Sequence, residues 1–352
     1  MTFKTDSIYN YNEGAKLIRA ELLKIVDEQI FEAGLDPVQD KLGYVIETVE
    51  IPDWVFTSML GTHWLDEIGE TDDFPVFWLE QGYEKGYRLK RFANRIPITK
   101  PLRKWIENST KSAKLDGTVK VELAKLARNT DRLVRAAKIT RNELSLEVLT
   151  KGFSVTAAYW PWSAYPDGQP LFSNSHVIKA TWEIQSNLVT GALTQLKLEE
   201  AISKLRNMKD GIGRTMKLAS TYTLIVPTSL EATARKILND GSKFAAAVSD
   251  VAVGNDVTSS IFQWDGFRIE LLVIDWLNQP KKDGTKVGTA TNWFVINKDA
   301  VRNYEAFKTI VLFNEEMDMY EDKASKVMYV DIDLSLNSDF YNYECVCGSE
   351  WV

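Results

Sequence analysis

Residues 117–152 read GTVKVELAKLARNTDRLVRAAKITRNELSLEVLTKG, and neither Gly nor Pro interrupts the stretch between its two end glycines. Apolar residues recur at intervals of three, four and seven and form one stripe: Leu123, Leu126, Leu133, Ala137, Leu144 and Val148. This spacing predicts a helix of roughly 34 residues, about 50 Å long. A coiled coil is the alternative, but the stripe lacks a clean heptad of large residues. We therefore expect a long helix that lies across its own domain.

The sequence after this helix alternates between helical and extended patterns. A second helix is predicted over 192–209, with one apolar face made of Leu198, Ala201, Ile202, Leu205 and Met208. Tyr222–Val226 is typical of a buried strand, and Thr228 with Glu231 has the spacing of a capping box that opens a third helix. Further strands are expected at Ser260–Trp264, Phe267–Ile274, Asn292–Ile296 and Lys326–Ile332. The predicted class is α+β.

The sequence before the helix is marked by an uneven distribution of charge. An amphipathic helix is predicted over about 14–31. Residues 65–80 (LDEIGETDDFPVFWLE) hold six acids and no Lys or Arg, whereas residues 81–104 hold eight bases and one acid. Residues 87–93 and 96–99 predict two strands that are joined by a short turn at Asn94-Arg95. An ordinary solvated hairpin is one interpretation. A lone hairpin is marginally stable in water, however, so a neighbouring copy is the other expected support.

Composition excludes several classes of protein. The chain has 352 residues, a net charge of −7 and a pI near 5.2, which argues against a free-standing nucleic-acid binder. Eleven Trp residues fit either a rich core or a protein interface. Cys345 and Cys347 are poorly placed to bond each other, so we expect an intracellular protein without disulfides. No run of ~18 apolar residues is present, and no membrane segment is expected.

A search for catalytic motifs gives little. The two His residues, His63 and His176, are far apart and lie outside any HExxH motif, and no GxSxG or GxxxxGK[ST] motif occurs. His176 follows Ser173 and Ser175, but a turn-bound histidine is favoured over a triad. The carboxylates near the C-terminus favour a solvated acidic face over a cation site: Glu315, Glu316, Asp318, Glu321, Asp322, Asp331 and Asp333. We predict no catalytic residue, no cofactor and no metal site.

Four stretches in one order resemble the Mu-type phage major head subunits, a family of tailed-phage capsid proteins with the Hong Kong 97 fold. GYRLKRFANRIPITK (86–100) resembles the extended loop of that family. The helix that ends in LTKGF (149–153), followed by DGQPLFS (167–173) and His176, resembles the spine helix and the motif after it. LEEAISKLRNMKDGIGRTM (198–216) and TLIVPTSLEATARKIL (223–238) are similar to the helix and the strand–Val-Pro–helix unit that follow in the family. Val177-Ile178 departs from the family, which has Pro and Asn after this histidine.

The resemblance implies five segments: an N-terminal arm with its helix (1–64), the extended loop (65–106), part of a peripheral domain with the spine helix 117–152 (107–192), a mainly axial domain (193–320) and a C-terminal return to the peripheral domain (321–352). It also implies a virion shell subunit, assembled in the bacterial cytoplasm as hexamers and pentamers around double-stranded DNA, with portal and scaffolding proteins as partners. An encapsulin-like compartment shell and a metal-dependent hydrolase are the alternatives.

The residues expected to touch a neighbouring subunit lie in the basic half of the predicted loop. Bases of the loop would meet acids of the neighbour while two aromatic rings pack beneath them. The predicted contact residues are Tyr87, Arg88, Lys90, Arg91, Phe92 and Arg95.

Overall fold

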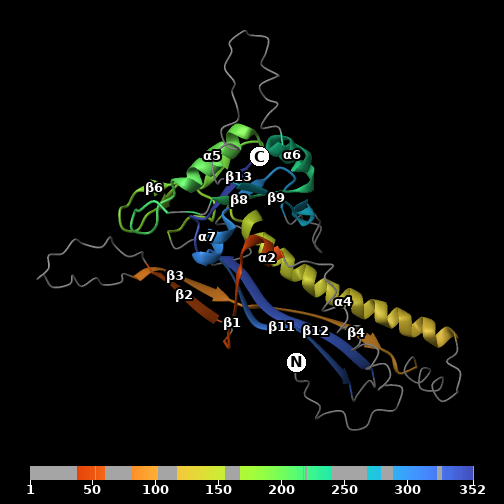
Figure 1. Cartoon of the computed structure of the whole chain (residues 1–352). Coiled ribbons are helices and arrows are strands. Elements are labelled where there is room, and N and C mark those ends of the chain that lie inside the picture. The colour runs from red at the N-terminus through yellow and green to blue at the C-terminus, as the bar shows by residue number, and fades with distance from the viewer. Residues whose placement is uncertain are drawn as a thin grey trace, which may run out of the picture. The chain divides into compact units, whose positions relative to one another are not determined.

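The computed structural model describes residues 38–51, 53–59, 81–101, 117–154, 167–216, 218, 220–239, 268–278, 288–322 and 327–351. The chain divides into two compact units (Figure 1). In the described part of the chain, unit 1 comprises Leu89–Asn142 and Val311–Leu336, and unit 2 comprises 38–88, 143–310 and 337–351. The helix predicted over 14–31 and the strand predicted at Ser260–Trp264 lie outside the described residues.

The long helix is confirmed as α4, Gly117–Thr150. Within unit 1 its buried positions include Leu133, Val134 and Ala137, and its outward positions are mostly basic. Ala137 lies about one helical turn after Leu133 and Val134, which is the spacing of the apolar stripe that the sequence shows. No helix among the described residues is both long and apolar enough to cross a membrane.

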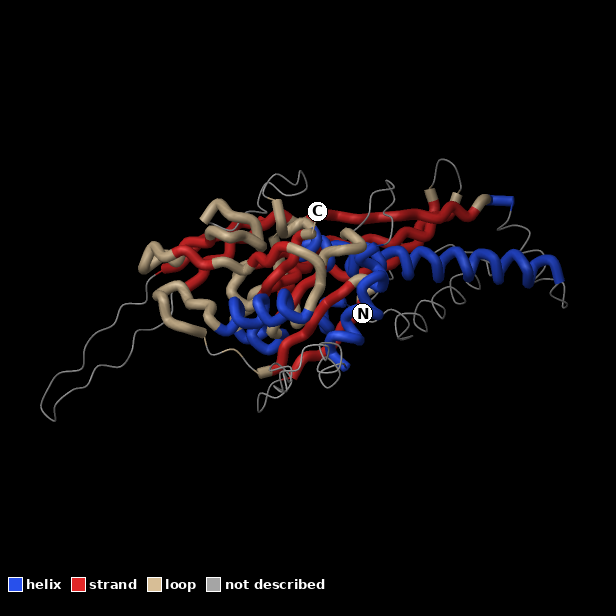
Figure 2. The backbone as a smooth tube through the Cα atoms, turned by 90° about the horizontal axis from the view of Figure 1, so that it is seen from above, coloured by secondary structure: helices blue, strands red, loops and turns tan. Residues whose placement is uncertain are grey.

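A four-stranded sheet has the order β1-β11-β12-β4, with bounds Val45–Thr48, Phe307–Glu321, Met328–Phe340 and Lys90–Ile98. From Met328 to Leu334 the side chains of β12 alternate between buried and half-buried, and its buried apolar residues in unit 1 are Met328, Val330, Ile332, Leu334 and Leu336. In unit 1, α4 runs alongside the long strands of this sheet (Figures 1 and 2). Because side chains of a strand alternate between its faces, one face of β12 supplies the core of unit 1.

The predicted turn at Asn94-Arg95 is wrong. β4 continues through both residues and pairs antiparallel with β12 along its whole length, from Ile98 opposite Met328 to Lys90 opposite Leu336. A two-residue hairpin turn needs a positive φ at one or both of its central positions, and neither residue has one. Pairing with β12, which lies over 200 residues away in sequence, provides the backbone hydrogen bonds of β4 instead.

The antiparallel hairpin of this region is formed by β2 (Asp53–Met59) and β3 (Gln81–Arg88), which belong to unit 2. Its register places Asp53 opposite Arg88 and Phe56 opposite Lys85, with an irregularity between Thr57 and Met59. The acidic stretch 65–80 therefore belongs to the segment that connects the ends of these two strands.

The central sheet of unit 2 has the order β7-β13-β10-β8-β9, with bounds Leu188–Thr190, Val346–Glu350, Trp293–Ile296, Thr221–Val226 and Arg268–Val273. The predicted strands at 222–226, 267–274 and 292–296 are confirmed. All residues of β10 and all but Thr221 of β8 are buried, because both faces of this sheet are covered.

One face of this sheet packs against α5 (Gln195–Arg206) and α6 (Glu231–Asn239). The predicted apolar face of α5 is confirmed, since Leu198, Ala201, Ile202 and Leu205 are all buried there. Alternate residues of the strands face the same cluster: Leu224, Val226, Trp293, Val295 and Cys347.

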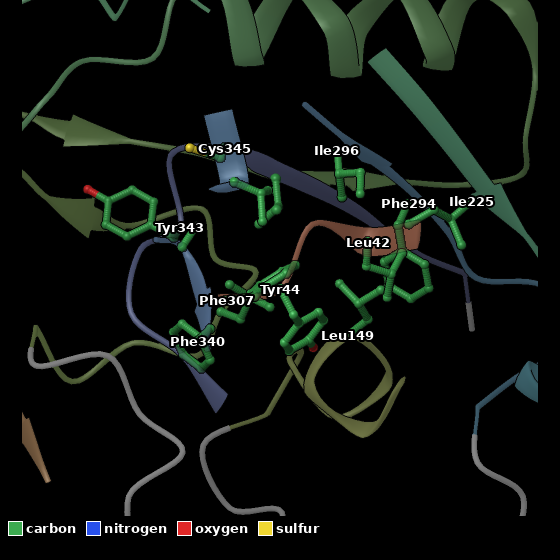
Figure 3. Close-up of a cluster of buried hydrophobic side chains, with 14 of the residues drawn as sticks. Leu42, Tyr44, Leu149, Ile225, Phe294, Ile296, Phe307, Phe340, Tyr343 and Cys345 are labelled. Atoms are coloured by element: carbon green, nitrogen blue, oxygen red, sulfur yellow. The ribbon is translucent and has the colours of Figure 1, made fainter. Parts of the chain in front are cut away.

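The opposite face of the sheet packs against the C-terminal end of α4 and against two short helices, α2 (Val38–Leu42) and α7 (Lys298–Asn303). Figure 3 shows this cluster, in which Leu149 of α4, Phe294 of β10 and Phe307 of β11 converge. Gly348 allows a close approach, because a Cβ built on it would lie 2.7 Å from the ring of Phe172.

The predicted capping box at Thr228 is wrong. A 3-10 turn, Thr228–Leu230, precedes α6 and has no side-chain cap; the Thr228 hydroxyl instead donates to Asp275 Oδ1 at 2.7 Å. Asp275 opens a second 3-10 turn, Asp275–Asn278. In a capping box the hydroxyl of this Thr would accept a hydrogen bond from a backbone N–H. Here the hydroxyl is instead bonded to a carboxylate from another element. The predicted stop at Gly241 lies outside the described residues.

Candidate assembly site

The predicted contact strand β4 carries a row of charges on its exposed face. The Arg95 guanidinium donates two hydrogen bonds to the carboxylate of Asp331, both 3.0 Å long, and its carbon lies 4.9 Å from the ring centroid of Tyr329. Arg91 Nε donates to Asp333 at 2.7 Å. We call these two pairs the charged ladder. Both arginine side chains stay exposed, at 72% for Arg91 and 53% for Arg95.

The sequence predicts that Arg91 and Arg95 meet acids of a neighbouring subunit. Within one copy, both already form ion pairs in the charged ladder. The acids belong to β12 of the same chain, because the antiparallel register brings them beside β4. Ion pairs between exposed side chains contribute only about 0–1 kcal/mol, and water screens them. Hydrogen bonding to Asp333 and Asp331 raises the pKa values of both guanidinium groups, which stay charged. The ladder gives little stability to the fold.

The other predicted contact residues lie in or beside the same strand. Arg88 ends β3 and is exposed; Lys90 and Phe92 are half-buried on β4. The backbone of Tyr87 pairs with Trp54 of β2, and the position of its side chain lies outside the described part. The structure therefore places five of the six predicted side chains on one stretch of chain, and it pairs Arg91 and Arg95 with acids of β12.

Sequence reasoning missed the buried charge at the base of the β2–β3 hairpin, which we call the hairpin root. Lys85 Nζ lies 3.0 Å from Asp339 Oδ1 and donates to Phe340 O at 2.7 Å, and it lies 3.7 Å from the centroid of the Phe340 ring. Burial lowers the pKa of Lys85 and raises the pKa of Asp339, while the attraction between the two groups opposes both shifts. No local pattern marks Lys85 as buried.

A second buried lysine supports the other strand of the hairpin. Lys308 of β11 is buried, forms an ion pair with Glu305 and lies 3.5 Å from Glu47. Its ammonium group lies 4.1 Å from the ring centroid of Phe56, the residue opposite Lys85 in the hairpin. Both strands of the hairpin root are thus held by charged groups from the same unit.

His176 is a structural residue that holds a turn. Its Nδ1 lies 2.9 Å from Asp167 Oδ2, its Nε2 lies 3.2 Å from Leu171 O, and its ring stacks on Tyr343 with 3.7 Å between centroids. Asn187, which the sequence did not single out, donates to the same Leu171 carbonyl at 2.7 Å. The predicted turn-bound histidine is confirmed.

The nearby hydroxyl groups do not form a triad with this histidine. The hydroxyls of Ser173 and Ser175 both donate to Gln169 Oε1, at 3.0 and 3.1 Å. A nucleophile needs a hydrogen bond to its base. These hydrogen bonds therefore support a structural turn.

Burial raises the pKa of Glu344 to about 8, with smaller contributions from Asp210 and Asp167. This carboxyl is buried in unit 2. Among the described residues, no group of three His, Cys, Asp or Glu side chains could hold a metal ion. Of the acidic face predicted between 315 and 333, Glu315 pairs with Arg141 at 3.5 Å, and Asp331 and Asp333 pair with β4.

Comparison with known proteins assigns the family. A family model described as phage capsid protein matches residues 82–334, which is more than half of the chain. The chain belongs to this phage capsid protein family. The predicted function, a major capsid protein of a tailed bacteriophage, is confirmed. The mixture of helices and strands confirms the predicted α+β class. The role of the protein is structural, and its place is the capsid of the virion.

Solved capsid structures resemble the chain at low sequence identity. The capsid of the cyanophage P-SCSP1u is 10% identical, with a TM-score of 0.47, over 89% of this chain and 88% of that chain. Gordonia phage Cozz is 11% identical, with a TM-score of 0.47, over 90% and 86%. A virus-like particle from Pyrococcus furiosus is 10% identical, with a TM-score of 0.38, over 95% and 98%. No curated protein sequence matches the chain.

Proposed function

We propose that copies of this protein assemble as hexamers and pentamers into an icosahedral shell that encloses double-stranded DNA. The family match over residues 82–334 is the observation that carries the proposal. The net charge of −7 supports it, because a wall that held phosphates tightly would impede filling of the shell. Assembly takes place in the bacterial cytoplasm, with portal and scaffolding proteins as further partners, and the subunit catalyses no reaction.

The proposed assembly uses strand β4 and the end of β3 as a contact with a neighbouring copy. β4 is the edge strand of its sheet, and the guanidinium groups of Arg91 and Arg95 remain exposed although they are paired. An exposed pair can exchange its acid for one on a neighbour at little cost in free energy. The proposed contact residues remain Tyr87, Arg88, Lys90, Arg91, Phe92 and Arg95.

The division into peripheral and axial domains is part of the same proposal. The peripheral domain would hold α4 and the strands β11, β12 and β4, and the axial domain would hold the sheet that α5 and α6 cover. The extended loop is assigned to the hairpin of β2 and β3 with its connection 60–80, since the predicted turn at Asn94-Arg95 does not exist.

Negative-stain electron microscopy of the purified protein tests the proposal most simply. Closed particles of uniform diameter are expected, and nucleic acid is their expected content in infected cells. A protein cargo in place of DNA would favour the alternative compartment shell. A protein that stays monomeric at every concentration and salt tested, with or without its scaffolding partner, would contradict shell assembly.

Charge reversal tests the contact residues separately. The substitutions Arg88→Glu, Lys90→Glu, Arg91→Glu and Arg95→Glu, made one at a time, should each lower the yield of particles because like charges would face each other across the contact. Circular dichroism should show a folded subunit in every case. Normal yields for all four variants would remove this strand from the interface.

A further inference from the structure

Helix α4 carries a concentration of positive charge on an otherwise acidic chain. Between Lys125 and Lys138 it holds five bases and one acid, Asp131, and therefore a net charge of +4. Because the whole chain has a net charge of −7, the remaining residues together carry −11. An anionic partner is attracted to this part of the helix and repelled by most of the rest of the chain.

The bases of this stretch lie mainly on the side of α4 that faces solvent. Four of them recur at intervals of three and four residues, so they share one exposed side of the helix. We call this side the basic face, and its residues are Lys125, Arg128, Arg132 and Arg135. The buried residues Leu133, Val134 and Ala137 lie on the opposite side of the helix.

Two arginines of the basic face are not engaged by acids of the described chain. Arg135 forms an ion pair with Asp131, and its Nε lies 3.1 Å from the carboxylate. Arg128 and Arg132 form no ion pair within the part of the chain that the structure describes. Their guanidinium groups lie about one helical turn apart, and each offers a planar fork of N–H donors to an external anion.

A groove of about 260 Å³ opens between α4 and strand β4 beside Arg132. Two amides and two guanidinium groups form its polar lining, from Asn94, Arg95, Asn129 and Arg132, and none of its lining residues is acidic. The amide oxygen of Asn94 accepts a hydrogen bond from the Arg95 backbone N–H at 2.9 Å, so its NH₂ group is the donor on offer. Convergent donors beside apolar atoms suit a phosphodiester, whose charged oxygens accept hydrogen bonds while its sugar makes apolar contacts.

The length of the basic face matches a stretch of duplex DNA. From Lys125 to Arg135 the helix advances about 15 Å. Phosphates of one strand follow each other about every 3.4 Å along the duplex axis, so about four of them lie beside this length. The proposed function places duplex DNA at high concentration inside the shell, which favours DNA over an acidic protein as the partner.

We propose that the basic face of α4 contacts phosphates of the packaged duplex, with one phosphate held at the groove beside Arg132. The inference rests on the proposed function and names the surface that meets the enclosed DNA. Each contact is weak and independent of base sequence, because the guanidinium groups recognise only the backbone. A few weak contacts in every copy hold the duplex at the wall without preventing its movement during filling.

Binding of a short DNA duplex to the unassembled subunit tests the contact. The variant is Arg128→Gln with Arg132→Gln. The matched control is Arg235→Gln with Arg268→Gln, which removes two exposed arginine charges from unit 2. Fluorescence anisotropy at low salt should give a dissociation constant on the order of 10 μM for the wild type, equal for two duplexes of different sequence. The variant should bind about tenfold more weakly, and the control within about twofold of the wild type.

The salt dependence of binding separates phosphate contacts from a general loss of structure. Each phosphate that the protein neutralises contributes about 0.9 to the slope of log K against log salt concentration. Removing two contacts should therefore lower the slope by about two, whereas the slope of the control should stay at the wild-type value. Circular dichroism should show the same folded subunit for wild type, variant and control.

Electron cryo-microscopy of filled particles tests the same contact in the assembled shell. In wild-type particles the outermost layer of DNA density should lie against Arg128 and Arg132. The variant should form shells at normal yield, because the basic face is not assigned to a contact between copies. Its DNA density next to α4 should be weaker than in the wild type.

Three results would overturn the inference. Equal duplex binding by wild type and variant, or none by either, would mean that the basic face does not contact phosphates. A basic face on the outer surface of filled particles would place it out of reach of the enclosed DNA. Loss of particles by a folded variant would assign the basic face to a protein contact. Failure of the wild-type protein to form shells would instead contradict the proposed function, so the two failures are distinguishable.

Discussion

The two units use paired charges in opposite ways. At the hairpin root of unit 2, Lys85 and Asp339 are both withdrawn from water, and each would lose the opposite charge beside it if the other were removed. On the charged ladder of unit 1, Arg91 and Arg95 keep most of their surface in water beside Asp333 and Asp331. The buried pair specifies where the hairpin begins, whereas the exposed pairs leave charge available to another molecule.

Removing one member of the buried pair should give the largest effect. Lys85→Met leaves the Asp339 carboxyl buried without its cation, and we expect the free energy of unfolding to fall by about 3–5 kcal/mol. Urea denaturation of the unassembled subunit measures it. The double variant Lys85→Met with Asp339→Leu should recover much of the loss, because no unpaired charge remains. A double variant as unstable as the single one would show that packing, and not charge, decides the loss.

The buried acid Glu344 should make the stability of the fold depend on pH. Burial raises the pKa of Glu344 to about 8, above its ordinary value of 4.5. The carboxyl therefore stabilises the fold most below about pH 4.5, and this contribution is lost as the pH rises toward 8. Glu344→Gln should raise stability at pH 7 by on the order of 3 kcal/mol relative to its effect at pH 4. Equal effects at both pH values would contradict the raised pKa.

Two glycine substitutions compare the loss of stability at a tightly packed position with that at a position with free space around it. Gly348→Ala forces a methyl group to within 2.7 Å of the Phe172 ring and should cost about 1–3 kcal/mol. The matched control is Gly86→Ala in β3, where nothing lies within 4 Å of the added carbon. Thermal unfolding by calorimetry compares the two. Similar melting temperatures for the two variants would mean that the sheet can shift away from Phe172.

The smallest effect on stability is expected on the charged ladder. Asp333→Asn weakens the pair with Arg91, and we expect a change below about 1 kcal/mol because water screens the pair. Urea denaturation at low and high salt measures it, and the difference from wild type should shrink further at high salt. A loss as large as that of Lys85→Met would mean that the ladder supports the fold.

Local sequence patterns predicted the elements whose partners did not need to be known. The apolar stripe predicted α4, and short stretches typical of buried strands predicted β8 and β10, because these patterns report burial directly. β11 was missed: its outer half, FNEEMDMYE, looks like a solvated acidic stretch, and only pairing within the sheet makes it a strand. The false turn at Asn94-Arg95 has the same origin, since β12 lies too far away in sequence to be inferred as the partner of β4.

The sequence predicted the bases of the candidate site but not the acids that pair with them. The clustering of bases around Arg91 and Arg95 is visible in the sequence, but the acids that meet them within the same chain follow from the β4–β12 register. Lys85 and Lys308 could not be recognised as buried, since lysine is almost always exposed and no local pattern marks the exceptions.

We infer that the exposed charges of the charged ladder form contacts between copies in the shell, whereas the buried charges of the hairpin root stabilise the single subunit. Measuring particle yield by light scattering and unfolding free energy by urea denaturation on one variant, Arg91→Glu, tests it most directly. We predict a clear fall in particle yield together with an unfolding free energy close to that of wild type. Normal particle yield with a subunit destabilised by several kcal/mol would contradict the claim.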